Sequence, residues 1–333
     1  MNALCKEIES FAVSSVIADT IYFGGGTPSL LNPKQVGSVI STASAVFEVD
    51  KDPEVTMEMN PATVTPGSLS AYRELGVNRA SFGVQTFNDR DLKLLARGHD
   101  ADDARSTFRL LRDAGFENIS FDLIAGLPGQ SLDDWNRNLD EALSMQPEHL
   151  SLYLLEIHEG TPLAEQIRSG RRTPIDDDAA AEMYELMTDR VEEAGYEQYE
   201  ISNFAKPGFE SRHNTKYWKL DPVFGFGVSA HSFDGTERYA NVSDTAAYLK
   251  KIECEGSSEV FRERIHESAE VAFLGLRLTE GIDVEGYIHR FGADLIEKAE
   301  HLEADGLIEM VAGRLRLTRK GRLFSNEVFT EFV

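Results

Sequence analysis

Short apolar runs alternate with amphipathic stretches along the first half of the chain. The runs are rich in β-branched and aromatic residues and cover 20–23, 55–59, 79–84, 118–124 and 150–155. Between them, apolar residues recur with helical spacing near 33–47, 66–75, 89–96, 101–114 and 131–145. This order predicts an α/β fold with parallel strands joined by right-handed helical crossovers. The periodicity fits a parallel barrel and a doubly wound sheet equally well.

The strand–helix repeat weakens after residue 156. A helix near 177–194 and a strand near 198–204 precede a stretch rich in Gly and aromatic residues, 205–233, which we expect to be a functional loop. From residue 261 onward, two or three helical patterns precede a short hairpin, an order typical of a small α+β, winged-helix-like module. We therefore predict three regions, 1–200, 201–260 and 261–333.

Charge and cysteine content limit the kinds of partner that the chain can bind and the cell compartment in which we expect it. The 333 residues carry a formal charge of −24, which argues against nucleic acid as a partner. A local basic cluster near the C-terminus does not reverse this, because residues 261–333 hold more acidic than basic side chains. The two cysteines form no disulfide framework, and neither a membrane span nor a signal peptide is apparent. We expect a cytoplasmic protein.

The sharpest local feature is the run Gly24-Gly25-Gly26-Thr27-Pro28, which directly follows the first predicted strand. Consecutive glycines let the backbone approach a ligand closely and direct several N–H groups at one point. The spacing fits neither the dinucleotide fingerprint nor a P-loop. A tight turn would explain one glycine; three favour ligand contact.

Polar side chains stand at the ends of the next predicted strands. Glu58, Gln85 and Asp122 each close or interrupt an apolar run, and a carboxylate there is costly unless it has a partner. Asp122 alone could simply cap a loop, and Arg97 alone could be a surface residue. Together, at the carboxyl ends of parallel strands, these side chains predict a pocket. Arg97 would supply the cation for a ligand carboxylate.

These motifs occur in a familiar order. Gly-Gly-Gly-Thr-Pro, Glu-x-Asn-Pro, Gly-Val-Gln-x-Phe and Asp-Leu-Ile-x-Gly-Leu-Pro-Gly-Gln resemble the radical S-adenosylmethionine (SAM) proteins related to oxygen-independent coproporphyrinogen III oxidase. The resemblance implies a partial (β/α)6 barrel over 1–200 and a small C-terminal domain over 261–333. It also implies a SAM site made of Gly24, Gly25, Gly26, Thr27, Glu58, Gln85, Arg97, Asp122, Ala125 and Gly126.

A second motif resembles one subfamily within this family. His213-Asn214-Thr215-Lys216-Tyr217-Trp218 matches the HNxxYW signature of HemW-type heme chaperones. An imidazole can ligate heme iron, and Tyr and Trp rings offer flat apolar surfaces to a macrocycle. The resemblance thus implies heme contact by His213, Tyr217 and Trp218, with His213 as the iron ligand and His231 as the competing imidazole. Without the resemblance, a structural turn would be the simpler explanation of this motif.

The implied function is heme binding and delivery to heme-accepting proteins, with peripheral membrane association through those acceptors. The alternative within the same resemblance is coproporphyrinogen III oxidase itself, which decarboxylates propionate side chains. The sequence leaves open whether the chain is an enzyme.

The chain departs from the family pattern in one respect. Members carry a CxxxCxxC loop whose three thiolates hold a 4Fe–4S cluster, whereas this chain has only Cys5 and Cys254, far apart. Leu4, Ile8 and Phe11 lie at near-helical spacing, so we expect the chain to open inside the first barrel helix. Either the start is placed late and the barrel is N-terminally truncated, or the protein has lost its cluster. In both cases we expect this chain not to cleave SAM reductively.

Overall fold

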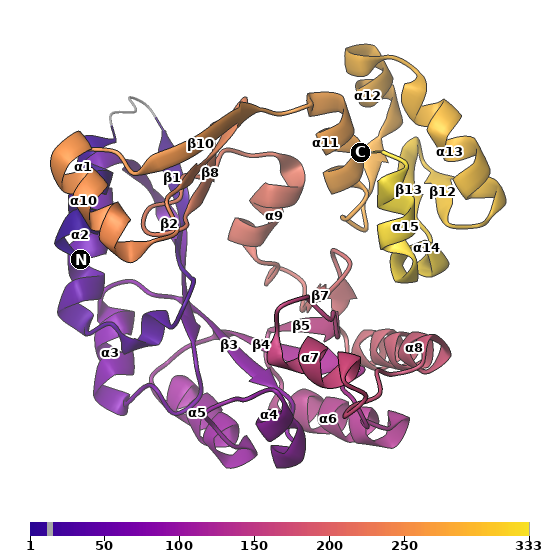
Figure 1. Cartoon of the computed structure of the whole chain (residues 1–333), viewed down its shortest axis with the longest axis horizontal. Coiled ribbons are helices and arrows are strands. Elements are labelled where there is room, and N and C mark those ends of the chain that lie inside the picture. The colour runs from indigo at the N-terminus through magenta and orange to yellow at the C-terminus, as the bar shows by residue number, and fades with distance from the viewer. Residues whose placement is uncertain (12–15, 333) are drawn as a thin grey trace. The chain divides into compact units, whose positions relative to one another are not determined.

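The computed structural model describes residues 1–11 and 16–332. Its largest sheet has seven strands in the order β1-β2-β3-β4-β5-β7-β6 and curls into a half-barrel (Figure 1). The strands are β1 (Ile17–Phe23), β2 (Glu48–Met59), β3 (Arg79–Gln85), β4 (Asn118–Ala125), β5 (His149–Leu154), β6 (Glu197–Gln198) and β7 (Asn203–Ala205). The expected α/β fold with a partial barrel is therefore confirmed.

Strands β2 to β5 pair in parallel, and β7 joins β5 in the antiparallel direction. The register aligns Glu58 with Ser81, Ser81 with Ser120, and Ser120 with His149. Two residues further toward the carboxyl ends, and therefore on the same face, Asp122 pairs with Ser151. Polar side chains from neighbouring strands therefore stand in rows on one face of the sheet.

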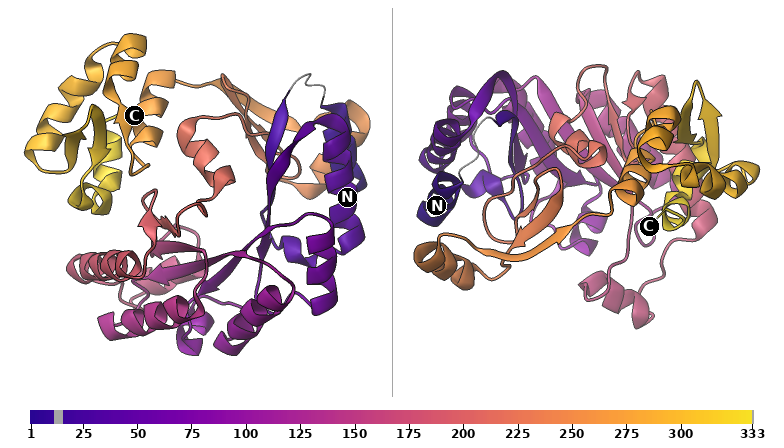
Figure 2. Two further views of the ribbon diagram at one scale, coloured as in Figure 1. Left: turned by 180° about the vertical axis from the view of Figure 1, so that it is seen from behind. Right: turned by 90° about the horizontal axis from the view of Figure 1, so that it is seen from above.

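The other sheet face is apolar. Met57, Phe82 and Phe121 are at most 1% exposed, and the Phe82 and Phe121 rings meet edge to face at 4.8 Å. Helices pack on this side: α5 against β3, and α8 against β4 and β5 (Figure 2). The helices of this part are α3 (Pro66–Glu74), α4 (Asp89–Leu94), α5 (Ala101–Asp113), α6 (Leu132–Met145), α7 (Pro162–Arg168) and α8 (Asp177–Glu193).

Three of these helices begin at reciprocal capping boxes. Thr65, Asp100 and Ser131 each accept a hydrogen bond from the backbone N–H three residues on, while the side chain there bonds back to the cap. Such caps satisfy backbone donors that the first helical turn leaves unpaired. They fix where each helix starts after its strand, and therefore where each strand-end loop lies.

The chain divides into two compact units. The central unit comprises Tyr22–Asn32 and Val55–Glu210, and the terminal unit comprises Met1–Ile21, Pro33–Glu54 and Ser211–Val333. The boundary falls within β1 and again within β2.

The terminal unit holds α1 (Asn2–Ser10), α2 (Pro33–Val46) and a small antiparallel sheet in the order β10-β9-β8. The Glu7 carboxylate organises it by accepting hydrogen bonds from Gly227 N–H at 2.8 Å, Asn241 Nδ2 at 2.6 Å and the Tyr248 hydroxyl at 2.6 Å. Multiple donors satisfy a carboxylate that is only 9% exposed. The remaining elements here are α9 (Arg212–Lys219), β8 (His231–Phe233), β9 (Glu237–Asn241), α10 (Thr245–Glu255) and β10 (Glu259–Arg264).

The C-terminal part of this unit is the small α+β region that the sequence predicts. A three-stranded sheet in the order β11-β13-β12 packs with short helices. Its elements are α11 (Glu267–Gly275), β11 (Ile282–Asp283), α12 (Val284–Phe291), α13 (Asp294–Ala304), β12 (Ile308–Val311), β13 (Arg314–Leu317), α14 (Arg319–Leu323) and α15 (Ser325–Thr330).

The structure corrects the expectation for residues 205–233. This stretch contains the helix α9, which begins where Ser211 accepts a hydrogen bond from Asn214 N–H. The pattern of apolar and polar residues did not reveal this helix, because α9 is short and none of its residues is buried. In the described part of the chain, no helix is long and apolar enough to cross a membrane.

Trp135 tests the packing of α6 in the central unit. Its side chain is fully buried, and its Nε1 donates to Met183 O at 3.1 Å. We expect Trp135→Ala to lower the free energy of unfolding by about 3–5 kcal/mol, because it leaves a large cavity and removes the buried hydrogen bond to Met183 O. Leu132→Ala, on the exposed side of the same helix, should cost under about 1 kcal/mol. Urea unfolding of both variants measures this, and equal losses would contradict the packing described.

Candidate functional site

The triglycine loop lies directly beside Glu58. Gly25 N–H donates to Glu58 Oε2 at 3.1 Å, and the Tyr22 hydroxyl donates to Oε1 at 2.8 Å. Gly25 and Gly26 have φ values of 75° and 62°, in the left-handed region that glycine adopts at little cost. A Cβ on Gly24 would lie 2.6 Å from the Tyr22 ring. The loop therefore requires glycine for conformation at two positions and for space at the third.

Asn60 links two further predicted site residues, Thr27 and Arg97, through hydrogen bonds. Its Nδ2 donates to Thr27 Oγ1 at 3.1 Å, and its Oδ1 accepts from Arg97 at 3.3 Å. Arg97 also donates to Gly83 O at 3.3 Å. These bonds hold the guanidinium between the strand ends of β2 and β3, where it can meet an anionic group.

Gln85 ends β3 in a strained conformation. Its φ is 66°, which is uncommon for a residue with a side chain. A methyl group on Gly83 would collide with the Gln85 amide and lie 3.1 Å from the Arg97 guanidinium. The two polar side chains thus cover the same backbone position, which only glycine leaves open.

Asp122 stands one strand further along the sheet. Desolvation raises the pKa of its carboxyl to about 6, against the opposing effects of the Ser151 hydrogen bond and the Arg79 charge. Glu58 and Arg97 also act on it electrostatically, so it lies among the other strand-end residues. An acceptor of this kind, near neutral pH, suits hydroxyl donors.

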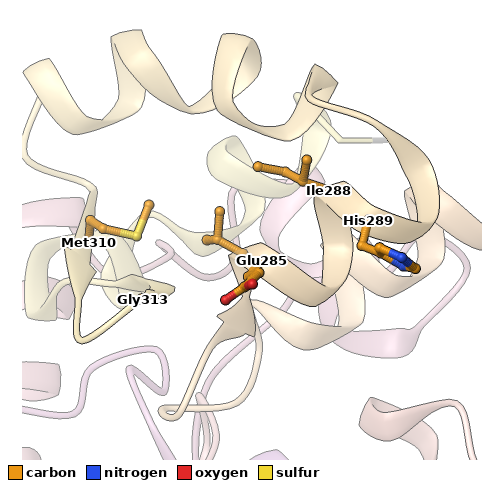
Figure 3. A pocket seen from close by; sticks show the side chains of 6 residues that line it. Glu285, Ile288, His289, Met310 and Gly313 are labelled. Carbon is orange, nitrogen blue, oxygen red and sulfur yellow. The ribbon is translucent and has the colours of Figure 1, made fainter.

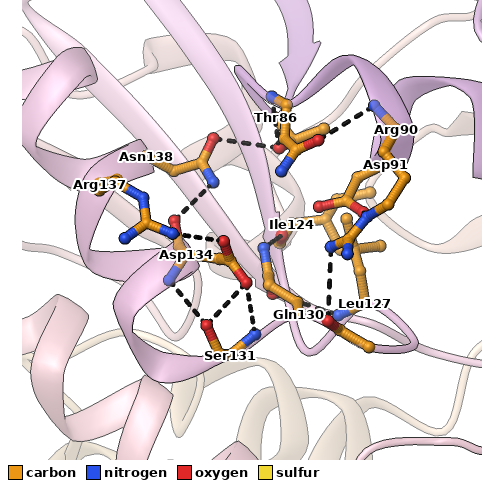
Figure 4. A network of polar contacts seen from close by, with 12 residues as sticks. Thr86, Arg90, Asp91, Ile124, Leu127, Gln130, Ser131, Asp134, Arg137 and Asn138 are labelled. Carbon is orange, nitrogen blue, oxygen red and sulfur yellow. Dashed lines mark hydrogen bonds and ion pairs between the residues drawn. The ribbon is translucent and has the colours of Figure 1, made fainter.

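The loop after β4 carries the last two predicted residues. Ala125 is fully buried, and Gly126 has a φ of 79° and donates its N–H to Gln130 Oε1 at 2.8 Å. Figure 4 shows the polar network around this loop, in which Gln130 reaches back to the loop and Ser131 bonds to Asp134. The backbone at Gly126 is therefore fixed by its own loop.

Arg79, whose charge acts on Asp122, was not predicted from the sequence. The residue is 1% exposed, and among the described residues its Nε has no hydrogen-bond partner. Its register neighbours Thr56 and Asn118 likewise each keep a buried side-chain oxygen without one. The signal was present, because polar residues alternate with apolar ones along β2, β3 and β4.

The structure thus gathers the predicted strand-end residues in the central unit. They come from the loop after β1 and from the carboxyl ends of β2, β3 and β4. Gly25 bonds to Glu58, Asn60 links Thr27 to Arg97, and the charges of Glu58 and Arg97 act on Asp122. The set offers backbone N–H groups, a guanidinium and two carboxylates, which can bind a charged, hydroxyl-bearing molecule. The SAM assignment of these residues stays a prediction.

The predicted heme residues lie on α9 in the terminal unit. The Glu54 carboxylate accepts from Arg212 N–H and His213 N–H, both at 3.0 Å, which favours a helix start here. His213 Nδ1 lies 2.9 Å from Thr20 Oγ1, and its Nε2 lies 3.1 Å from the Tyr217 hydroxyl. Contacts at both ring nitrogens therefore fix the orientation of the imidazole.

A hollow of about 300 Å3 adjoins the aromatic end of α9. It is lined by Tyr217, Trp218, Leu220, Asp221, Phe233, Arg238 and Leu274. The Arg277 guanidinium lies 4.3 Å from the centre of the Trp218 ring, so this cation covers one indole face. The hollow thus combines flat apolar side chains with the Arg238 guanidinium. Arg238 Nη2 donates a hydrogen bond to Glu270 Oε2 at 2.8 Å, which holds the guanidinium in place.

His231, the competing imidazole, is exposed at the start of β8. A larger apolar hollow of about 480 Å3 lies in the C-terminal region, bordered by Ile288 and Met310, with His289 also among the lining residues (Figure 3). It contains none of the residues that the sequence predicts for a ligand site.

The cluster of the resembled family does not fit this chain. Its two cysteines are Cys5 on α1 and Cys254 on α10, fewer than the three thiolates such a cluster requires. In the described ranges, no group of three or more His, Cys, Asp or Glu side chains could hold a metal ion.

Comparison with known proteins agrees with this geometry. Residues 5–142 match the family model of the radical SAM superfamily, and residues 263–324 match that of the HemN C-terminal domain. Coproporphyrinogen III oxidase (HemN) from Escherichia coli superposes with a TM-score of 0.84 at 22% identity, over 99% of this chain and 82% of the enzyme. That likeness shows the fold. The half-barrel with its triglycine loop is thus a radical SAM fold.

Sequence similarity is more specific. The chain is 37% identical to the heme chaperone HemW of Bacillus subtilis, over the whole of this chain and 90% of that protein. It is 34% identical to the heme chaperone HemW of Mycobacterium tuberculosis, over 98% of this chain and 84% of the relative. The chain belongs to the HemW heme chaperone family, which confirms the resemblance.

Asp122 gives a test of the electrostatics. Its folded-state pKa of about 6 exceeds the ordinary value of 3.8, so ionisation above pH 6 costs folding free energy, and this cost is absent below pH 3.8. We expect Asp122→Asn to raise the free energy of unfolding at pH 8 by about 1–3 kcal/mol and to change it little at pH 3.5. Asp133→Asn, at an exposed position, is the matched control. Urea unfolding at both pH values measures the effect, and a destabilised Asp122→Asn at pH 8 would contradict it.

Proposed function

We propose that this chain binds heme through α9 and carries it to heme-accepting proteins, some of them at the membrane surface, in the cytoplasm. The observation that carries the proposal is the His213 imidazole, oriented by Thr20 on one side and directed toward Tyr217 on the other. The names of the relatives, heme chaperone HemW, support the same function.

The surroundings of α9 suit a tetrapyrrole. An imidazole nitrogen is a common iron ligand, and a hydrogen bond at the other ring nitrogen sets its orientation. The neighbouring hollow offers Tyr217, Trp218 and Phe233 to an apolar macrocycle, and Arg238 to a propionate carboxylate. At about 300 Å3 it takes one edge of a macrocycle and leaves the rest accessible to an acceptor.

We further propose that the strand-end residues of the central unit bind SAM. Gly24, Gly25 and Gly26 leave room for its methionine end, and Gly26 has open space around its backbone. Arg97 would pair with the carboxylate, Glu58 would accept from the amino group, and Asp122 would accept from the ribose hydroxyls. Thr27 and Gln85 would line the same end, while Ala125 and Gly126 would flank the adenine.

Reductive cleavage of SAM is a separate step. A 4Fe–4S cluster supplies the electron for it in radical SAM chemistry, and this chain lacks the thiolates to hold one. We therefore propose that the chain by itself binds SAM without cleaving it. Oxidative decarboxylation of coproporphyrinogen, the alternative function, would need that same step.

Heme binding is tested by absorbance titration with ferric heme. We expect the parent chain to give a shifted Soret band, and His213→Ala to lose the shift and weaken binding at least about tenfold, because one iron ligand is removed. His231→Ala and His289→Ala serve as matched controls and should behave as the parent does. If His213→Ala binds as the parent does while His231→Ala loses the band, the ligand is His231 and the assignment to α9 fails.

SAM binding and cleavage are tested on the same purified chain. Isothermal titration calorimetry should show SAM binding that weakens about tenfold or more in Arg97→Ala, because a charge-assisted contact to the carboxylate is lost. With dithionite present, no 5′-deoxyadenosine should form. Its formation by this chain would refute the proposed inactivity and leave the SAM site itself untouched.

A further inference from the structure

We infer that Tyr217 closes the heme site in the unloaded protein, and that Thr20 holds His213 in the tautomer that can ligate iron once Tyr217 moves away. This inference rests on the proposed heme function and adds its regulation. It follows from two hydrogen bonds to opposite sides of one imidazole ring, both within the terminal unit.

A neutral imidazole has one N–H donor and one lone-pair acceptor. Thr20 and Tyr217 both carry hydroxyls that can donate or accept, but the phenol is the stronger donor of the two. The favoured arrangement therefore has Tyr217 donating to Nε2, at 3.1 Å, and Nδ1–H donating to Thr20, at 2.9 Å. In this arrangement Nε2 holds the lone pair that iron needs, and the Tyr217 hydroxyl occupies it.

The two contacts differ in accessibility. The bond between His213 and Thr20 is partly buried, with Thr20 fixed on β1, whereas the bond to Tyr217 is exposed. Tyr217 itself is 45% exposed and lies one helical turn beyond His213, with the two rings meeting edge to face at 5.4 Å. A rotation of the Tyr217 side chain would release Nε2 without moving the α9 backbone, since Glu54 holds that backbone through the N–H groups of Arg212 and His213.

Thr20 then acts as a positioning residue, because it keeps its bond to Nδ1 whether or not iron is bound. Partners of this kind fix the ring orientation of metal-ligating histidines, and their loss typically costs about 10–100-fold in affinity. Tyr217 acts in the opposite sense. Its hydroxyl competes with iron, so removing the hydroxyl should strengthen heme binding.

The test compares two conservative variants with the parent in ferric heme titrations and stopped-flow binding. Tyr217→Phe keeps the ring and removes the hydroxyl, and it should bind heme about 3–10-fold more tightly, mainly through a faster association rate. Thr20→Val keeps the shape and removes the hydroxyl, and it should bind about 10-fold more weakly. Tyr239→Phe, in the same unit, is the matched control and should equal the parent.

A second measurement needs no heme. Nitrogen-15 NMR of the unloaded chain should show His213 with its proton on Nδ1, and Thr20→Val should shift the population toward the other tautomer. A parent His213 protonated on Nε2 would overturn the inference. So would a Tyr217→Phe variant that binds heme no faster than the parent, or one that loses the Soret band, which would make Tyr217 itself the ligand. If His213→Ala binds heme normally, the proposed ligand fails, while the NMR result still decides the unloaded geometry.

Discussion

The alternation of side chains along the half-barrel strands is the constraint on which the rest of the structure depends. Each strand sends one set of residues into the helices and the other to the opposite face. On the helix side, Met57, Phe82 and Phe121 are almost completely buried. Burial of that face fixes the register, and a slip of one residue would exchange the two faces. The register thereby determines that Glu58, Ser81, Ser120 and His149 align on the polar face.

That polar face is costly for folding, which is typical of a ligand site. The Asp122 carboxyl has a raised pKa, Gln85 is in a left-handed conformation, and Arg79 is buried with no bond to its Nε from the residues that the structure describes. Each feature costs stability on its own. The apolar packing on the other face and the capped helices offset these costs.

The sequence predicts much of this arrangement. Strand positions, the capped helix at Ser131 and the convergence of Gly25, Glu58 and Asp122 follow from periodicity and from the rule that strand ends share one edge. The SAM and heme roles of these residues came from the family resemblance. The sequence did not predict α9, because its side chains are not buried and a short helix leaves little pattern. It could not predict the bonds of His213 either, since Thr20 and Glu54 are distant in sequence and are brought to it only by the fold.

We propose that the strand ends of the half-barrel form one ligand pocket. A crystal structure of this chain grown with SAM tests it most directly. We expect electron density for SAM with its carboxylate at Arg97, its ribose at Asp122 and its methionine end against the triglycine loop. SAM bound elsewhere on the chain, with those residues left in contact only with water, would show that the strand ends form no SAM site.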